Sequence, residues 1–131
     1  MNSPGRRSRT RPLTLRDAGK LALALPEVEE TTAYDMAAWK AGGRRFAGTP
    51  VPRADIEPNT LGIRVAIAER ERLLAARPDV YYLTAHYANY PAVLVRLAPL
   101  RRAELKAILV MAWQYAMEKG TSRPARGPRR R

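Results

Sequence analysis

Apolar residues recur at helical spacing near both ends of the chain. Thr14 begins the first of these segments, because "TLRD" has the spacing of a capping box. Pro26 ends it, since the residue before a proline disfavours helical geometry. Gly120 follows the second segment and favours the end of a helix. The sequence predicts two amphipathic helices with these apolar positions: Leu15, Ala18, Leu21, Ala22 and Leu25, then Leu105, Ile108, Leu109, Ala112, Trp113 and Ala116.

Between the two helices the pattern changes to the alternation that is typical of strands. Strands are expected within residues 31–50, on either side of Gly42 and Gly43, because glycine adopts the positive φ angles that a two-residue hairpin needs. Prolines and polar residues mark 51–59 as a loop. Further along, the sequence predicts a half-buried strand, a short helix and two more strands, at residues 60–67, 68–77, 80–84 and 92–98.

This order of elements predicts an α+β fold. We expect a mainly antiparallel sheet packed on one face by helices, in a two-layer α/β sandwich. A chain of 131 residues is expected to form a single domain, which we place at residues 13–119.

The net charge of +12 is concentrated at the two ends of the chain. Residues 1–12 contribute +4 and residues 119–131 contribute +6, which leaves +2 for residues 13–118. The end segments are rich in Arg, Pro, Gly and Ser, a composition that cannot bury enough apolar area to fold. We therefore expect disordered basic tails at 1–12 and 120–131. These tails would attract phosphates without sequence preference, although GC-rich codons also explain abundant arginine.

The available nucleophiles argue against an enzyme. The chain has no cysteine, and its serines, Ser3, Ser8 and Ser122, lie in the predicted tails. No Ser–His–Asp site can therefore form in the folded part. Thr31 and Thr32 are better explained as structural residues, because a threonine nucleophile needs an adjacent base. We predict no catalytic residues.

Metal ligands are sparse as well. His86 is the single histidine, whereas zinc sites draw on three or four nitrogen or sulfur ligands. The acidic residues Glu27, Glu29, Glu30 and Asp35 could in principle hold Mg²⁺, but they are more typical of a solvated connector. We predict no metal site and no cofactor.

The chain gives no indication of a membrane partner. The longest apolar segment, residues 107–113, is far too short to cross a bilayer, and no apolar segment follows the basic N-terminus as it would in a signal peptide. The lack of cysteine suits a reducing compartment. These features predict a cytoplasmic protein.

Element order and aromatic spacing stand out in three segments: "LALPEVEETTAYDMAAWKAGGRRFAG", "LGIRVAIAERERLLAARPDVYYLTAHYANYPAVLVRL" and the terminal amphipathic helix. In these segments, over roughly residues 13–117, the chain resembles the MmcQ/YjbR family. The resemblance implies a small α+β fold, sometimes called a double wing, with a CyaY-like sheet. Members are often described as DNA-binding, and no general catalytic residues are attached to the family. Ala92 departs from the pattern, because many members have Trp at that position.

The first binding hypothesis is a nucleic acid, either DNA or RNA. The expected hairpin tip "GGRR" would present guanidinium groups to phosphates, and Trp39 or Phe46 beside it would stack on a base. The alternative explanation is that the cations keep an exposed hairpin from aggregating while Trp39 packs in the core. The small charge of residues 13–118 predicts weak, sequence-tolerant binding. The candidate residues are Lys40, Arg44, Arg45, Arg53 and Arg64.

The second binding hypothesis places a small-ligand or protein site in the segment "AHYANYP". His86, Tyr87 and Tyr90 would form this site, with His86 as the group that titrates near neutral pH. The alternative explanation is that the tyrosine rings pack in the core with their hydroxyls at the surface, while His86 binds the backbone. The sequence leaves both binding hypotheses open.

Overall fold

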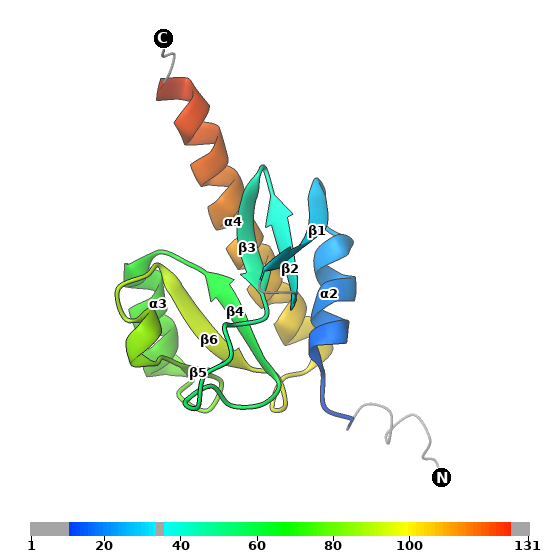
Figure 1. Cartoon of the computed structure of the whole chain (residues 1–131), viewed down its shortest axis with the longest axis vertical. Helices are drawn as coiled ribbons and strands as arrows, with labels where there is room; N and C mark the ends of the chain where they lie inside the picture. Colours follow the sequence, from blue (N-terminus) through cyan, green and yellow to red (C-terminus); the bar gives the residue numbers. More distant parts are fainter. Residues whose placement is uncertain (1–10, 34–35, 127–131) are drawn as a thin grey trace.

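The computed structural model describes residues 11–33 and 36–126 of the chain (Figure 1). Within them, six strands form one antiparallel sheet in the order β1-β2-β3-β4-β6-β5. The predicted α+β fold is confirmed. The strands are β1 (Val28–Ala33), β2 (Met36–Ala41), β3 (Arg44–Gly48), β4 (Thr60–Arg64), β5 (Tyr81–Tyr82) and β6 (Ala92–Arg96). The helices are α2 (Leu15–Leu23), α3 (Ile67–Ala76), the 3₁₀ turn η1 (Ala85–Tyr87) and α4 (Arg102–Arg126).

One face of the sheet is buried against helices. Leu61 and Ile63 of β4 point to the same side as their cross-strand partners Val95 and Val93, and all four belong to the apolar core. Helix α4 packs on β2, β3 and β4, and α2 packs beside α4. In Figure 1 α4 runs behind β2 and β3, α2 stands beside β1, and α3 lies beside β5 and β6. The two-layer arrangement therefore follows from apolar residues at every second strand position.

The other face of the sheet, which we call the outer face, carries the alternate residues. Gly62 and Arg64 of β4 lie there, together with their partners Leu94 and Ala92 of β6. Gly62 also pairs with Gly48 of β3. Small residues thus line the middle of the outer face, where a larger side chain would otherwise fill the space above the strands.

Trp39 packs from β2 against α2. Its side chain is 2% exposed, and a Cβ on Gly19 would lie 2.8 Å from its Cζ2 atom, so glycine lets the helix approach the sheet closely. The indole Nε1 donates a hydrogen bond to Oε1 of Glu30 at 3.2 Å. Phe46 is fully buried as well. The expectation that Trp39 or Phe46 stacks on a base is therefore wrong, because both rings serve the core.

Helix α4 is longer than the sequence predicts. It continues through Gly120 and ends at Arg126, so the predicted end of the helix at Gly120 is wrong. Glycine costs a helix about 1 kcal/mol relative to alanine, which a helix already anchored on the sheet tolerates. Residues 1–10 and 127–131 of the predicted tails lie outside the described residues.

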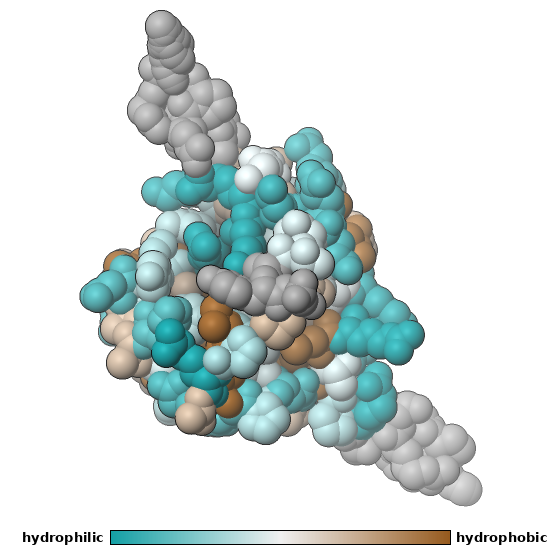
Figure 2. All heavy atoms as spheres, viewed as in Figure 1, coloured by the Kyte–Doolittle hydropathy of each residue, from teal (hydrophilic) through white to brown (hydrophobic). Residues whose placement is uncertain are grey.

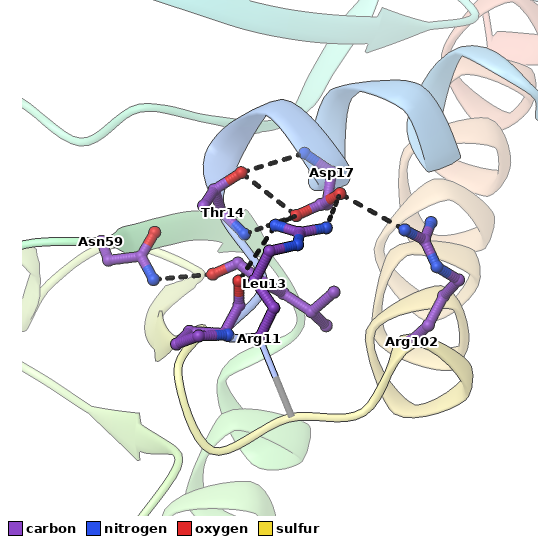
Figure 3. A network of polar contacts seen from close by, with 7 residues as sticks. Arg11, Leu13, Thr14, Asp17, Asn59 and Arg102 are labelled. Carbon is purple, nitrogen blue, oxygen red and sulfur yellow. Dashed lines mark hydrogen bonds and ion pairs between the residues drawn. The ribbon is translucent and has the colours of Figure 1, made fainter. Parts of the chain in front are cut away.

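A buried carboxylate joins the start of α2 to α4 (Figure 3). Asp17 is 6% exposed and completes the predicted capping box. Its Oδ2 accepts a hydrogen bond from the Thr14 backbone N–H at 2.8 Å, and Thr14 Oγ1 accepts one from the Asp17 backbone N–H at 3.4 Å. Arg102 of α4 donates to Oδ1 at 3.3 Å, and Arg11 donates to both carboxylate oxygens at 3.4 Å. The network therefore connects the two helices of the covering layer.

The same network controls the ionisation of Asp17. Burial alone would raise the pKa of Asp17, but hydrogen bonds from Thr14 and Arg11 outweigh it and lower the pKa from 3.8 to about 2. Because the pKa is lower in the folded than in the unfolded state, the stabilisation is complete above about pH 4 and is lost as the pH falls toward 2.

We expect Asp17→Asn to lower the free energy of unfolding at pH 7 by about 1 to 2 kcal/mol, a range that allows for solvent screening of the exposed arginines. The variant should also lose less stability than the wild type as the pH falls from about 4 to about 2, since it lacks this titration. Urea unfolding at a series of pH values measures both effects. Asp55→Asn, in an exposed loop, is the control. An unchanged pH dependence in Asp17→Asn would contradict this account.

Candidate functional site

A pocket of about 250 Å³ opens on the outer face of the sheet. Its walls come from β3 and the loop after it, from β4 and β6, and from η1 and the turn that follows it. The pocket brings together residues from both binding hypotheses: Arg45 and Arg64 from the first, and His86, Tyr87 and Tyr90 from the second. Hydrophilic residues cover most of the described surface in the view of Figure 2, and apolar residues show only as small patches.

A β-bulge places Arg45 in this pocket. Trp39 pairs with Ala47 while Lys40 pairs with Arg45, so Phe46 is the extra residue in β3. Phe46 turns into the core, and Arg45 lines the pocket. One Arg45 donor, Nη2, reaches the Thr49 carbonyl at 3.5 Å. Since a guanidinium has five N–H donors, most of them remain for a ligand.

Small residues beside Arg64 create the volume of the pocket. Arg64 is exposed at the end of β4, across from Ala92 of β6. Two residues earlier, Gly62 lines the pocket without a side chain. A Cβ at Gly62 would meet the Gly48 carbonyl oxygen at 3.5 Å and Leu94 at 4.0 Å, which are ordinary contacts. The floor therefore has room for a Cβ atom at this position, at the expense of the pocket.

Three aromatic rings form one wall of the pocket, which we call the ring wall. The His86 and Tyr87 ring centres lie 4.8 Å apart, and the Tyr90 ring centre lies 5.9 Å from that of His86 and 6.4 Å from that of Tyr87. The Tyr87 hydroxyl accepts a hydrogen bond from the Val51 backbone N–H at 3.1 Å. This bond joins the wall to the loop after β3. Tyr90 is 52% exposed, so its ring is accessible to a ligand.

Arg70 of α3 holds the ring wall from behind. It is 5% exposed, and its Nη1 donates to the carbonyls of Tyr90 at 2.8 Å, Ala88 at 3.2 Å and Tyr87 at 3.5 Å. Because Nη1 carries two N–H groups, at least one of them is shared between two carbonyls. Sequence reasoning missed this residue, since nothing in "AERERLLAAR" distinguishes Arg70 from its arginine neighbours.

The pocket holds positive charge that the described residues do not neutralise. Elsewhere on the outer face, Arg96 binds the two carboxylate oxygens of Glu57 at 2.8 and 2.9 Å and lies 4.4 Å from the Tyr82 ring centre. The hydrogen bonds from Arg96 lower the pKa of Glu57. Arg45 and Arg64, in contrast, form no ion pair with any described residue, and none of the described residues that line the pocket is acidic.

The other candidates of the first hypothesis lie outside the pocket. Lys40 lies directly across from Arg45, and Arg44 pairs with Ala41 near the hairpin tip. Arg53 is exposed in the loop between β3 and β4.

The hairpin tip is held against α4. Gly42 and Gly43 have φ angles of 59° and 79°, as the glycine turn predicts. A Cβ on Gly42 would lie 3.2 Å from Sδ of Met117 in α4. The hairpin therefore packs against a helix and does not project as a separate wing.

Two further observations concern metals and membranes. Within the described part of the chain, no three His, Cys, Asp or Glu residues lie close enough together to hold a metal ion. Of the acidic residues considered above, Glu30 binds Trp39, and Asp35 lies outside the described residues. No helix among residues 11–33 and 36–126 has the length and apolar character needed to cross a membrane.

Comparison with known proteins gives the family. A family model described as YjbR matches residues 23–115, more than half of the chain. The chain belongs to the YjbR family. The uncharacterized protein Mb2600 of Mycobacterium bovis is 32% identical over 107 residues, which cover 74% of this chain and 83% of that protein. The uncharacterized protein Rv2570 of Mycobacterium tuberculosis matches to the same extent.

A solved structure confirms the fold of this YjbR-family protein. The crystal structure of Deinococcus radiodurans protein DR2400, with the family-model domain DUF419, aligns with a TM-score of 0.65. The alignment covers 82% of this chain and 80% of that chain at 24% sequence identity. Likeness at this identity shows the fold alone, so the function of the pocket has to be argued from its chemistry.

We expect Arg70→Met to lower the free energy of unfolding of this YjbR-family protein by about 2 kcal/mol, because three backbone carbonyls lose the charge-assisted hydrogen bonds that they accept from a buried guanidinium. Arg72→Met is the matched control, since Arg72 is exposed and pairs with Glu69 on the surface of the same helix. Urea unfolding compares the two. Equal losses of stability would show that Arg70 does not hold the ring wall.

Proposed function

We propose that this YjbR-family protein is a non-enzymatic binding module whose outer-face pocket takes a small anionic ligand. The observation that carries the proposal is the position of Arg45 and Arg64 in one pocket with three rings, where no described wall residue is acidic. An anion bound there would neutralise Arg45 and Arg64, as Glu57 neutralises Arg96.

The walls favour an organic anion over a simple ion. Guanidinium groups present paired N–H donors that match the oxygens of a carboxylate or phosphate. Val51, Ile63 and Leu94 add apolar surface to the same pocket. A ligand with an anionic end and an apolar body would therefore gain both from charge pairing and from burial.

Binding without catalysis is supported by the surroundings of His86. The recorded contacts of His86 are with the rings of Tyr87 and Tyr90. The described pocket walls include no serine, threonine, cysteine or carboxylate. A serine, threonine or cysteine nucleophile activated by His86 would have to lie within hydrogen-bond reach of the imidazole.

A second candidate function is the binding of a single-stranded nucleic acid. The observation that favours it is the pairing of Lys40 directly across from Arg45, because opposite residues of an antiparallel pair share a face. Positive charge therefore continues beyond the pocket along the outer face. A phosphate chain would follow Lys40, Arg45 and Arg64 while a base contacts the ring wall.

The double variant Arg45→Gln/Arg64→Gln should weaken the binding of pyrophosphate by about tenfold to a hundredfold, since it removes charge-assisted hydrogen bonds. Calorimetric titration of the full chain at fixed ionic strength measures the affinity. The control is Arg16→Gln/Arg53→Gln, which removes the same charge from two exposed positions outside the pocket. Equal losses in the two double variants would indicate a general charge effect and overturn the site.

Lys40→Gln separates the two candidate functions. If a nucleic acid is the ligand, a twelve-nucleotide single strand should bind the full chain more tightly than pyrophosphate does. Lys40→Gln should then lower the slope of log affinity against log salt by about 0.7. If the ligand is small, the variant should leave the affinity for pyrophosphate nearly unchanged. The twelve-nucleotide strand should then bind the full chain little more tightly than pyrophosphate does. Fluorescence anisotropy over a salt series distinguishes these outcomes.

A further inference from the structure

We infer that the ligand of the pocket is a small aromatic or heteroaromatic acid, in which a carboxylate or phosphate is attached to a flat ring. The inference rests on the proposed anion site and specifies its ligand class. The acidic group would bind Arg45 and Arg64, and the flat ring would contact Tyr90 and His86 of the ring wall.

The ring wall has exposed aromatic surface for such a contact. The interplanar angles are 88° between His86 and Tyr87, 47° between His86 and Tyr90, and 65° between Tyr87 and Tyr90. No pair of these three rings is stacked face to face. Tyr90 is 52% exposed at the pocket. Aromatic groups attract a further ring in offset-stacked or edge-to-face geometry.

The wall is also held in place before a ligand binds. The Val51 backbone N–H donates to the Tyr87 hydroxyl, and Arg70 binds the carbonyls on both sides of Ala88. Ordering of a loop on binding normally weakens affinity, so a wall that is already fixed favours binding of a rigid ligand.

The size of the pocket limits the ligand. A cavity of about 150 Å³ is enough to hold benzene, whereas pockets for drug-sized ligands span about 300 to 1,000 Å³. The volume of about 250 Å³ found here fits one ring system with its acidic group. The small residues Gly62 and Ala92 provide this space, and the adjacent Arg64 gives the acidic group a partner.

The direct test compares phenyl phosphate with cyclohexyl phosphate, which has the same acidic group on a ring that is not flat. Calorimetric titration of the full chain should show phenyl phosphate binding about threefold to tenfold tighter, the range expected for an aromatic pair. Benzoate and cyclohexanecarboxylate form a second pair that distinguishes a carboxylate from a phosphate ligand. A preference for the flat ring in either pair supports the inference.

The variant Tyr90→Leu should abolish the preference for the flat ring, so that phenyl phosphate no longer binds more tightly than cyclohexyl phosphate. Tyr90→Phe is the matched control and should keep the preference. Both variants are expected to fold, because Tyr90 is largely exposed. A preference that survives Tyr90→Leu would overturn the assignment of the ring to this wall.

Gly62→Val tests whether the ring enters the pocket. The added side chain would occupy the floor, and valine suits a strand, so the fold should persist in thermal unfolding. Phenyl phosphate should bind at least about tenfold more weakly. Unchanged affinity in a folded variant would overturn the inference.

Equal binding of the flat and non-flat compounds, with both lost in Arg45→Gln/Arg64→Gln, would reject the ring while retaining the anion site. Binding of none of these acids would reject both proposals.

Discussion

Burial of one face of β4 and β6 in the apolar core beneath the helices is the constraint on which the rest of the structure depends. Leu61, Ile63, Val93 and Val95 have to face the helices to form the core. Because strand residues alternate between faces, this burial fixes the direction of every residue between them. Gly62 and Arg64 consequently point to the outer face, and a shift of one residue in register would bury Arg64. The core thus determines where the pocket lies.

Two local departures from regular structure complete the pocket. The bulge at Phe46 lets β3 bury an aromatic ring while Arg45 lines the outer face. The hydrogen bonds from Arg70 stabilise the irregular backbone around Ala88. The three carbonyls that accept these bonds take part in no strand pairing. Both features serve the core or the backbone in their own right. Their joint effect is to place two cations and three rings in one pocket.

Much of the fold could be predicted from the sequence, because apolar periodicity and glycine turns are local signals. The capping box at Thr14 and the turn at Gly42 and Gly43 illustrate this. The end of α4 could not be predicted, since packing on the sheet outweighs the weak helix preference of Gly120. The sequence points to five residues that line the pocket, but it divides them between two hypotheses: Arg45 and Arg64 in the first, and His86, Tyr87 and Tyr90 in the second. Their proximity depends on strand order and on Arg70, which a linear pattern does not encode.

The most direct test of the central claim follows the arginine side chains themselves. Titration of pyrophosphate into the full, isotope-labelled chain can be monitored by NMR through the Nε–H resonance of each arginine. The account predicts saturable shifts for Arg45 and Arg64, and little change for Arg96, which Glu57 already occupies. Shifts of similar size in all exposed arginines, or none in Arg45 and Arg64, would contradict an anion site in this pocket.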